Sequence, residues 1–156
     1  MTKPRTLILD TNLIVLLVVG LADEKAVPKH KRTRAYTVSD FRLLLTVISE
    51  YAELAALPNA LSEASNLLEF EGDGLPEKLF GRFSQLVATT REIYIPSLDA
   101  SGRSEFRRLG LTDAATLEAA KEGFHILSAD LGLCLAATKA GYNAANFTHA
   151  IEAARF

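Results

Sequence analysis

The sequence predicts an α/β fold built around a parallel sheet, and three observations lead to that prediction. A short apolar run at residues 6–9 ends in Asp10 and two further polar residues, which is typical of a buried parallel strand that runs into a loop. In the second half, strand-like segments alternate with helical ones, the pattern of βαβ units with right-handed crossovers. The 156 residues suit one full core without repeats or linkers. We therefore expect a single domain, 1–156, with a basic insertion at about 21–38.

Composition and charge limit the classes of function. The net charge is −2, so a global basic field gives no argument for nucleic acid, and any such surface would be local. The single cysteine, Cys134, excludes an internal disulfide and fits a reducing compartment. Asp10 interrupts the first apolar stretch, so we expect no secretory signal. The longest apolar run, 13–19, is far shorter than the roughly 20 residues that span a bilayer. We expect a cytoplasmic protein without membrane contact.

Residues 13–19 are apolar all round, which fits either a buried helix or a second strand. We favour a short helix, capped by Thr11 or Asn12 and ended by Gly20. The following residues, 21–37, are basic around a proline, and two interpretations stay open: a solvated loop, or an arm that contacts phosphates. Its positive and histidine side chains are Lys25, Lys29, His30, Lys31, Arg32 and Arg34.

Three amphipathic helices are predicted next. Ser39 would cap the first, with Asp40 in its first turn. Pro58 interrupts the pattern and Asn59 would cap the second, while Pro76 suits the first turn of the third. In order, these helices cover residues 41–55, 60–70 and 76–87, with a loop at 71–74.

Strands and helices alternate in the rest of the chain. Thr112 would cap one helix that Gly123 ends, and Thr148 would cap the last helix. A polar segment at 99–108 carries a second basic group. The predicted strands are 92–95, 124–127 and 142–147, and the predicted helices are 113–122, 131–140 and the residues from 148 onward.

Several acids fall where the predicted strands end or the helices begin. Asp10 and Asp130 follow strands, Asp113 opens a helix, and Glu63 lies on a helix of the first half that could reach the same edge. Carboxylates about 4 Å apart repel by roughly 1 kcal/mol in water and roughly 4 kcal/mol at an effective dielectric near 20. A divalent cation would offset this repulsion, and oxygen ligands favour Mg²⁺ or Mn²⁺. The three histidines show no spacing typical of a zinc site.

Each acid also has an ordinary structural explanation. Asp113 suits the first turn of a helix, where the helix dipole stabilises it, and Asp10 and Asp130 suit turns. Glu63 fits a solvated helix face. Only the combination and its order along the chain indicate a functional site.

That order resembles the PIN-domain family of nucleases, which includes the VapC-type toxins. The resemblance covers nearly the whole chain, and its individual motifs are short. It rests on residues 9–12 (LDTN), 61–68 (LSEASNLL), 111–115 (LTDAA) and 127–130 (LSAD), with 146–147 (NF) near the end.

The resemblance implies a three-layer α/β/α sandwich with a central, mainly parallel sheet. It also implies that Asp10, Glu63, Asp113 and Asp130 bind one or two Mg²⁺ or Mn²⁺ ions and cleave RNA phosphodiesters. The sequence departs from the compact VapC-type toxins in the longer basic segment between residues 20 and 39. This departure argues against the toxin role and leaves the nuclease site unaffected. If the protein is a toxin, an antitoxin protein is its expected partner.

Within this hypothesis the residues have different roles. Asp10 would be the most central ligand, and Glu63 would bind through water or orient the nucleophile. Thr11, Asn12 and Ser128 would hold the carboxylates by hydrogen bonds. The cations expected to contact RNA phosphates are Lys29, Lys31, Arg32, Arg34, Arg103, Arg107 and Arg108.

Other hypotheses also fit parts of the sequence. A PIN-like module could hold RNA or a protein without cutting, although all four acids are present. A receiver-type phosphotransfer domain usually has adjacent acids after its first strand, whereas here only Asp10 ends it. Apolar helix faces suggest a homodimer. Cys134 and His125 are interpreted as structural, because neither has a partner expected of a nucleophile or a metal ligand.

Overall fold

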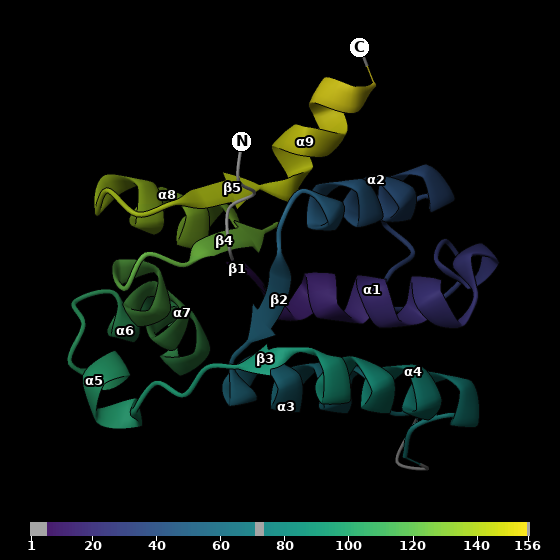
Figure 1. Cartoon of the computed structure of the whole chain (residues 1–156), viewed down its shortest axis with the longest axis horizontal. Coiled ribbons are helices and arrows are strands. Elements are labelled where there is room, and N and C mark those ends of the chain that lie inside the picture. Colours follow the sequence, from purple (N-terminus) through teal and green to yellow (C-terminus); the bar gives the residue numbers. More distant parts are fainter. Residues whose placement is uncertain (1–5, 71–73, 156) are drawn as a thin grey trace.

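The fold is organised around a five-stranded sheet whose strands all run parallel (Figure 1). The computed structural model describes residues 6–70 and 74–155. The strand order is β3-β2-β1-β4-β5. The strands are β1 (Thr6–Leu9), β2 (Glu53–Ala56), β3 (Arg91–Glu92), β4 (His125–Ser128) and β5 (Ala144–Asn146). The helices are α1 (Thr11–Ala22), η1 (Glu24–Ala26), α2 (Val38–Ser49), α3 (Pro58–Leu68), α4 (Glu77–Thr89), α5 (Ser97–Ser101), α6 (Phe106–Leu109), α7 (Leu111–Lys121), α8 (Leu131–Lys139) and α9 (Phe147–Ala154).

Helices cover both faces of the sheet, which makes the predicted three-layer α/β/α arrangement. Successive side chains of a strand point to opposite faces. Leu7 and Leu9 of β1 therefore pack with α1, α2, α3 and α4 in one core. Ile8 packs in a second core with α5 and α7, and α7 also packs against α8. The central strand β1 is buried on both faces, as strands of parallel sheets usually are.

Helix α1 is the helix that the apolar run predicted, and it is buried because the sheet and three helices surround it. Asp10 caps it, rather than Thr11 or Asn12, because the Asp10 carboxylate accepts a hydrogen bond from the first backbone N–H of the helix. Gly20 does not end it, since α1 continues to Ala22. Among the described residues, no helix is long and apolar enough to cross a membrane.

Gly20 is needed for packing and not for a turn. A Cβ added there would overlap the ring of Phe41, which is itself buried. We expect Gly20→Ala to lower the free energy of unfolding by at least about 1 kcal/mol, although helix propensity alone favours alanine by about that amount. The matched control is Gly81→Ala in α4, where nothing lies within 4 Å and stability should rise. Urea unfolding of both variants measures this, and a stabilised Gly20→Ala protein would contradict the packing argument.

The predicted helix over 41–55 is wrong at both ends. The N-cap is Thr37 and not Ser39, because Thr37 and Asp40 form a reciprocal capping box. The helix ends at Ser49, and Glu53–Ala56 forms strand β2. Strand β2 was not predicted because Ala52 and Ala55 continue the helical spacing of the apolar residues before them. Pairing with β1 on one side and β3 on the other makes this segment a strand.

Smaller differences follow in the middle of the chain. Helix α3 starts at Pro58 and ends at Leu68, so Asn59 lies inside it and is not a cap. Helix α4 follows Pro76 as predicted. Of the predicted loop at 71–74, residues 71–73 lie outside the described residues. The strand predicted at 92–95 is shorter and earlier.

The second half follows the prediction more closely. The largest difference is the polar segment 99–108, most of which belongs to the short helices α5 and α6. Gly110, at φ 92°, precedes α7, so Thr112 is inside that helix and not its cap. The last helix is capped by Asn146 rather than Thr148, and it begins with Phe147, a residue predicted to end a strand.

Candidate active site

The candidate site lies where the chain leaves the two adjacent strands β1 and β4. These strands pair in parallel, and the chain continues from β1 into α1 on one face and from β4 into α8 on the other. Ligands of open α/β sheets bind in the crevice at such a switch point, outside the carboxyl ends of the strands. Asp10 follows β1 and Asp130 follows β4, and the Asp10 N–H donates to the Leu127 carbonyl at 3.1 Å. The topology therefore places two of the predicted acids at this switch point.

Asp10 is the most buried of the four acids, at 7% exposed. Its Oδ1 accepts from the Thr11 N–H at 2.9 Å, and its Oδ2 accepts from the Ser128 hydroxyl at 2.7 Å. The same Ser128 oxygen accepts from the Asp130 N–H at 2.9 Å, so one hydroxyl connects the two loops. Burial raises the pKa of Asp10 despite the hydrogen bonds from Ser128 and Thr11, and the charges of Asp130 and Glu63 add to the rise.

Glu63 reaches this edge from α3. Its Oε2 accepts from the Thr11 hydroxyl at 3.1 Å, and its Oε1 accepts from the Thr112 hydroxyl at 2.5 Å. The side chain therefore bridges the first turns of α1 and α7. It is exposed on its other side. Glu63 is held in a defined orientation that still gives it access to solvent.

The pKa of Asp113 indicates that the four acids lie close together. It lies in the first turn of α7 and is half-buried. Its pKa rises to about 7, first because of burial and then because of the charges of Asp10, Asp130 and Glu63. The charges of the other three predicted acids therefore all reach Asp113, which places the four carboxylates in one region.

Asp130 has an ordinary structural role as well. Its Oδ1 accepts from the Leu133 N–H at 3.0 Å and so caps α8. Asp10 caps α1, and Asp113 sits in the first turn of α7. Carboxylates at helix N-termini are stabilised by the helix dipole, which explains how the fold tolerates three acids here.

The oxygen atoms of the four acids and their hydroxyl partners are of the type that binds a hard divalent cation. Their present arrangement fits such a cation less well. All donors are carboxylate or hydroxyl oxygens, the ligands that hard divalent cations prefer. Burial and the charges of the other three acids raise the pKa of Asp113, and a bound cation would lower it. In residues 6–70 and 74–155, however, no three Asp, Glu, His or Cys side chains are arranged as a ligand group. Ser128, Thr11 and Thr112 already hold two of the carboxylates. Cation binding would therefore require some of these side chains to rotate.

The other predicted site residues separate into two groups. Thr11 and Ser128 do hold the acids, whereas Asn12 is exposed. Arg103 does not offer a free guanidinium, since it forms ion pairs with Glu105 and Glu118. The remaining cations predicted to contact RNA are exposed: Lys29, Lys31, Arg32 and Arg34 in the segment after η1, and Arg107 and Arg108 on α6.

Tyr36 is a residue near the site that the sequence did not single out. Burial raises its pKa, and the charges of Asp40 and Asp10 raise it further. Its ring packs against Phe147 at 6.1 Å between centroids. The only local signal was an aromatic residue at the end of a basic segment. Its position near Asp10 depends on how α2 and α9 pack.

Cys134 and His125 have structural surroundings, in agreement with their interpretation. Cys134 is buried, its pKa is raised to about 11, and its Sγ faces the Ser128 carbonyl at 3.7 Å. His125 lies at the start of β4 and its Nδ1 is 3.3 Å from the Tyr51 hydroxyl.

Comparison with known proteins adds no assignment. No model of a known protein family matches the chain, and no curated protein matches it. The sheet order and the convergence of four acids are therefore the observations on which function must be argued.

Proposed function

We propose that the protein is a Mg²⁺- or Mn²⁺-dependent endoribonuclease of the PIN-domain type, which hydrolyses RNA phosphodiester bonds. The observation that carries this proposal is the convergence of Asp10, Glu63, Asp113 and Asp130 at the switch point of the sheet, where the neighbouring charges raise the pKa of Asp10 and of Asp113. Acids whose pKa is raised by burial and by neighbouring charges are typical of functional sites.

Asp10, Asp113 and Asp130 are the residues that would hold the cation. When bound, a divalent cation stabilises the developing charge of phosphoryl transfer and lowers the pKa of water. The Ser128 hydroxyl keeps the Asp10 carboxylate oriented, and its link to the Asp130 N–H keeps the two loops in register.

Glu63 has a different part in this proposal. Thr11 and Thr112 fix both of its oxygens from the protein side, while the side chain stays exposed to solvent. It can therefore orient a water molecule toward the scissile phosphorus and accept its proton at a carboxylate oxygen. The exposed edge suits a single-stranded or looped RNA better than a duplex.

The same proposal extends to cellular role. The resemblance to VapC-type toxins suggests a toxin with an antitoxin protein as partner, and the apolar helix faces suggest a homodimer. An RNA substrate and a lone reduced cysteine fit the cytoplasm. The alternative is a PIN-like module that binds RNA or protein without cutting, and the absence of a ligand arrangement among the described residues is what favours it.

The direct test measures cleavage of a labelled single-stranded RNA with Mn²⁺ or Mg²⁺, and with a chelator. We expect cleavage only with the metal, and Glu63→Gln should reduce its rate by about 10–100-fold, as loss of residues around a metal does. The control is Glu122→Gln, the same change at the amino end of β4 next to Gly123 and Phe124. Unchanged cleavage in the chelator would contradict metal dependence, and metal-dependent RNA binding without cleavage would favour the non-cleaving module.

A further inference from the structure

A pocket of about 380 Å³ lies between α6 and α8, outside the acidic site. Arg108 and Lys139 line it from the two helices, and both side chains are exposed. In the part of the chain that the structure describes, neither cation forms an ion pair with a carboxylate. The full lining is Ser104, Glu105, Arg108, Ala136, Lys139 and Ala140.

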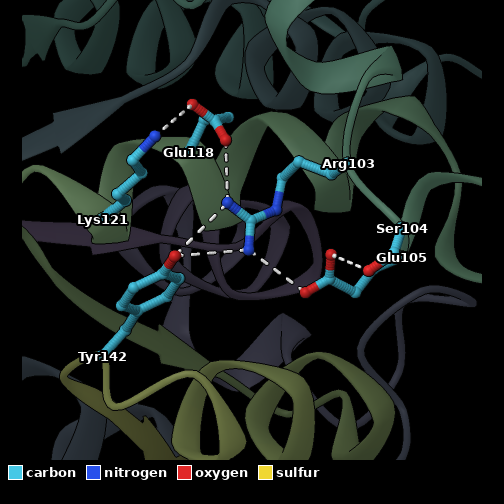
Figure 2. Close-up of polar contacts among 6 residues, drawn as sticks. All are labelled: Arg103, Ser104, Glu105, Glu118, Lys121 and Tyr142. Atoms are coloured by element: carbon cyan, nitrogen blue, oxygen red, sulfur yellow. Dashed lines mark hydrogen bonds and ion pairs between the residues drawn. The ribbon is translucent and has the colours of Figure 1, made fainter.

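The one acid of this pocket, Glu105, is already neutralised (Figure 2). Its Oε2 is 3.1 Å from a nitrogen of Arg103, and its Oε1 accepts from the Ser104 hydroxyl at 3.2 Å. The Arg103 side chain is only 11% exposed and pairs also with Glu118 at 2.8 Å. Because Glu105 faces this guanidinium, it offers little repulsion to an anion in the pocket.

Further contacts keep that guanidinium in place. The Tyr142 hydroxyl accepts from both terminal nitrogens of Arg103 at 3.4 Å, with the ring centroid 5.5 Å from the Arg103 Cζ, and Lys121 approaches Glu118 at 4.0 Å (Figure 2). The two acids and two cations of this cluster balance in charge. The net positive charge of the pocket therefore comes from Arg108 and Lys139 alone.

The pocket and the acidic site lie along the same pair of helices. A Cβ added at Gly132, in the first turn of α8, would lie 3.2 Å from Asp130 Oδ1 and 3.4 Å from Leu109 of α6. The end of α6 thus contacts the beginning of α8 beside Asp130. From there to Lys139, α8 rises by roughly 12 Å, a distance that a few nucleotides of single strand can cover.

We propose that the pocket lined by Arg108 and Lys139 binds a backbone phosphate of the RNA, a few nucleotides from the bond that the acidic site cleaves. This inference rests on the proposed function and names a second contact of the same substrate. The ligand is a phosphodiester anion, which Arg binds through a planar pair of N–H groups and Lys as a point charge.

The test is the affinity for a short fluorescein-labelled oligouridylate, measured by anisotropy in a chelator over a series of salt concentrations. Arg108→Gln with Lys139→Gln should weaken binding by about tenfold for each cation that the double variant removes. The slope of log affinity against log salt should fall by about 0.7 for each of these cations. Inorganic phosphate and uridine monophosphate, added as competitors, separate recognition of a chain from recognition of a free anion.

The matched control removes two cations from another pocket of similar volume. Lys78→Gln with Arg82→Gln changes the net charge equally, at a pocket that Ala22 lines at the far end of α1 from Asp10. Equal weakening in both double variants would overturn the proposal, because net charge alone would then explain it. Full displacement of the oligouridylate by low concentrations of inorganic phosphate would overturn the claim of a chain-binding contact.

The two proposals can fail separately. If the wild type cleaves RNA and the pocket variant keeps its affinity and rate, the pocket proposal is wrong and the nuclease proposal stands. If no RNA is cleaved but the pocket variant alone loses affinity, the phosphate contact holds and the nuclease proposal is wrong. Circular dichroism melting confirms that each variant is folded before affinity is compared.

Discussion

Asp10→Asn should reduce metal-dependent RNA cleavage by about 100-fold or more while leaving the protein folded. Replacing residues that merely support metal ligands already costs 10–100-fold, so the loss of a central ligand should cost at least as much. Asp10 is the acid that the fold holds most tightly, by burial and by the Thr11 and Ser128 hydrogen bonds. The measurement is the initial cleavage rate at saturating Mn²⁺.

The fold should survive this change for a physical reason. Asparagine caps helices about as well as aspartate, so the bond from the Thr11 N–H to the residue at position 10 can be kept. The substitution also removes the buried Asp10 carboxylate. The pKa of this carboxyl group is raised by burial and by the charges of Asp130 and Glu63, so its charged form is disfavoured in the folded protein. In a chelator, the melting temperature of Asp10→Asn should therefore equal or exceed that of the wild type.

The control for this prediction is the same change at the other end of the same helix. Asp23→Asn alters an exposed residue at the C-terminal end of α1 and should leave the cleavage rate unchanged. Equal rates for wild type and Asp10→Asn would show that the cutting comes from another site or a contaminant. A normal rate per folded molecule in an unstable Asp10→Asn protein would also contradict the role proposed for Asp10.

Millimolar Mn²⁺ should raise the melting temperature, and more at pH 8 than at pH 5. A ligand at 100 times its dissociation constant adds about 2.7 kcal/mol to the native state, which corresponds to about 5–10 °C for a chain of this size. The pH dependence follows from Asp113, whose pKa is about 7 in the folded protein against an ordinary value of 3.8. At pH 5 the folded carboxyl keeps its proton, and a cation must displace it.

Without metal, the stability of the folded protein has the opposite dependence on pH. Between about pH 4 and pH 7 the folded protein holds a proton at Asp113 that the unfolded chain has lost, so stability falls as the pH rises through this range. Above pH 7 the full penalty of the charged group is present. Burial and the neighbouring acids cause it, and cation binding would relieve it.

Asp113→Asn isolates that penalty. In a chelator at pH 8, it should raise the free energy of unfolding by about 1–2 kcal/mol, a figure reduced for the partial exposure of the side chain. The gain should shrink toward pH 4, and the Mn²⁺ effect should be much weaker than in the wild type. Denaturant unfolding at several pH values measures both. A gain that did not depend on pH would refute the assignment to charge.

Several elements could be predicted because their signals are local. The apolar run of β1 ends at Asp10, and the carboxylate of Asp10 caps the next helix within one residue. The same arrangement of strand, acid and helix recurs around Asp130, where the cap bond spans three residues. The α/β class, the position of Asp10 and Asp130 after strands and that of Asp113 in the first turn of a helix were predicted from such short-range patterns, whereas the capping role of Asp10 was not.

Other features depend on contacts between distant residues, and the sequence did not predict them. Strand β2 looked like the end of a helix, because its identity depends on hydrogen bonds to β1 and β3. Arg103 looked like a cation free to bind RNA. Its ion pair with Glu118 and its contact with Tyr142 join residues 15 and 39 positions away. Residue patterns over a few neighbouring positions do not predict such contacts.

By itself, then, the sequence determined which residues are acids that follow strands or begin helices, because apolar periodicity and caps act within a few residues. Only the tertiary structure decided that Glu63 crosses to Thr11 and Thr112, which lie 52 and 49 positions away. It also decided that Ser128 joins Asp10 across 118 positions. The reason is that strand order and helix packing set these long-range distances, and no spacing along the chain encodes them.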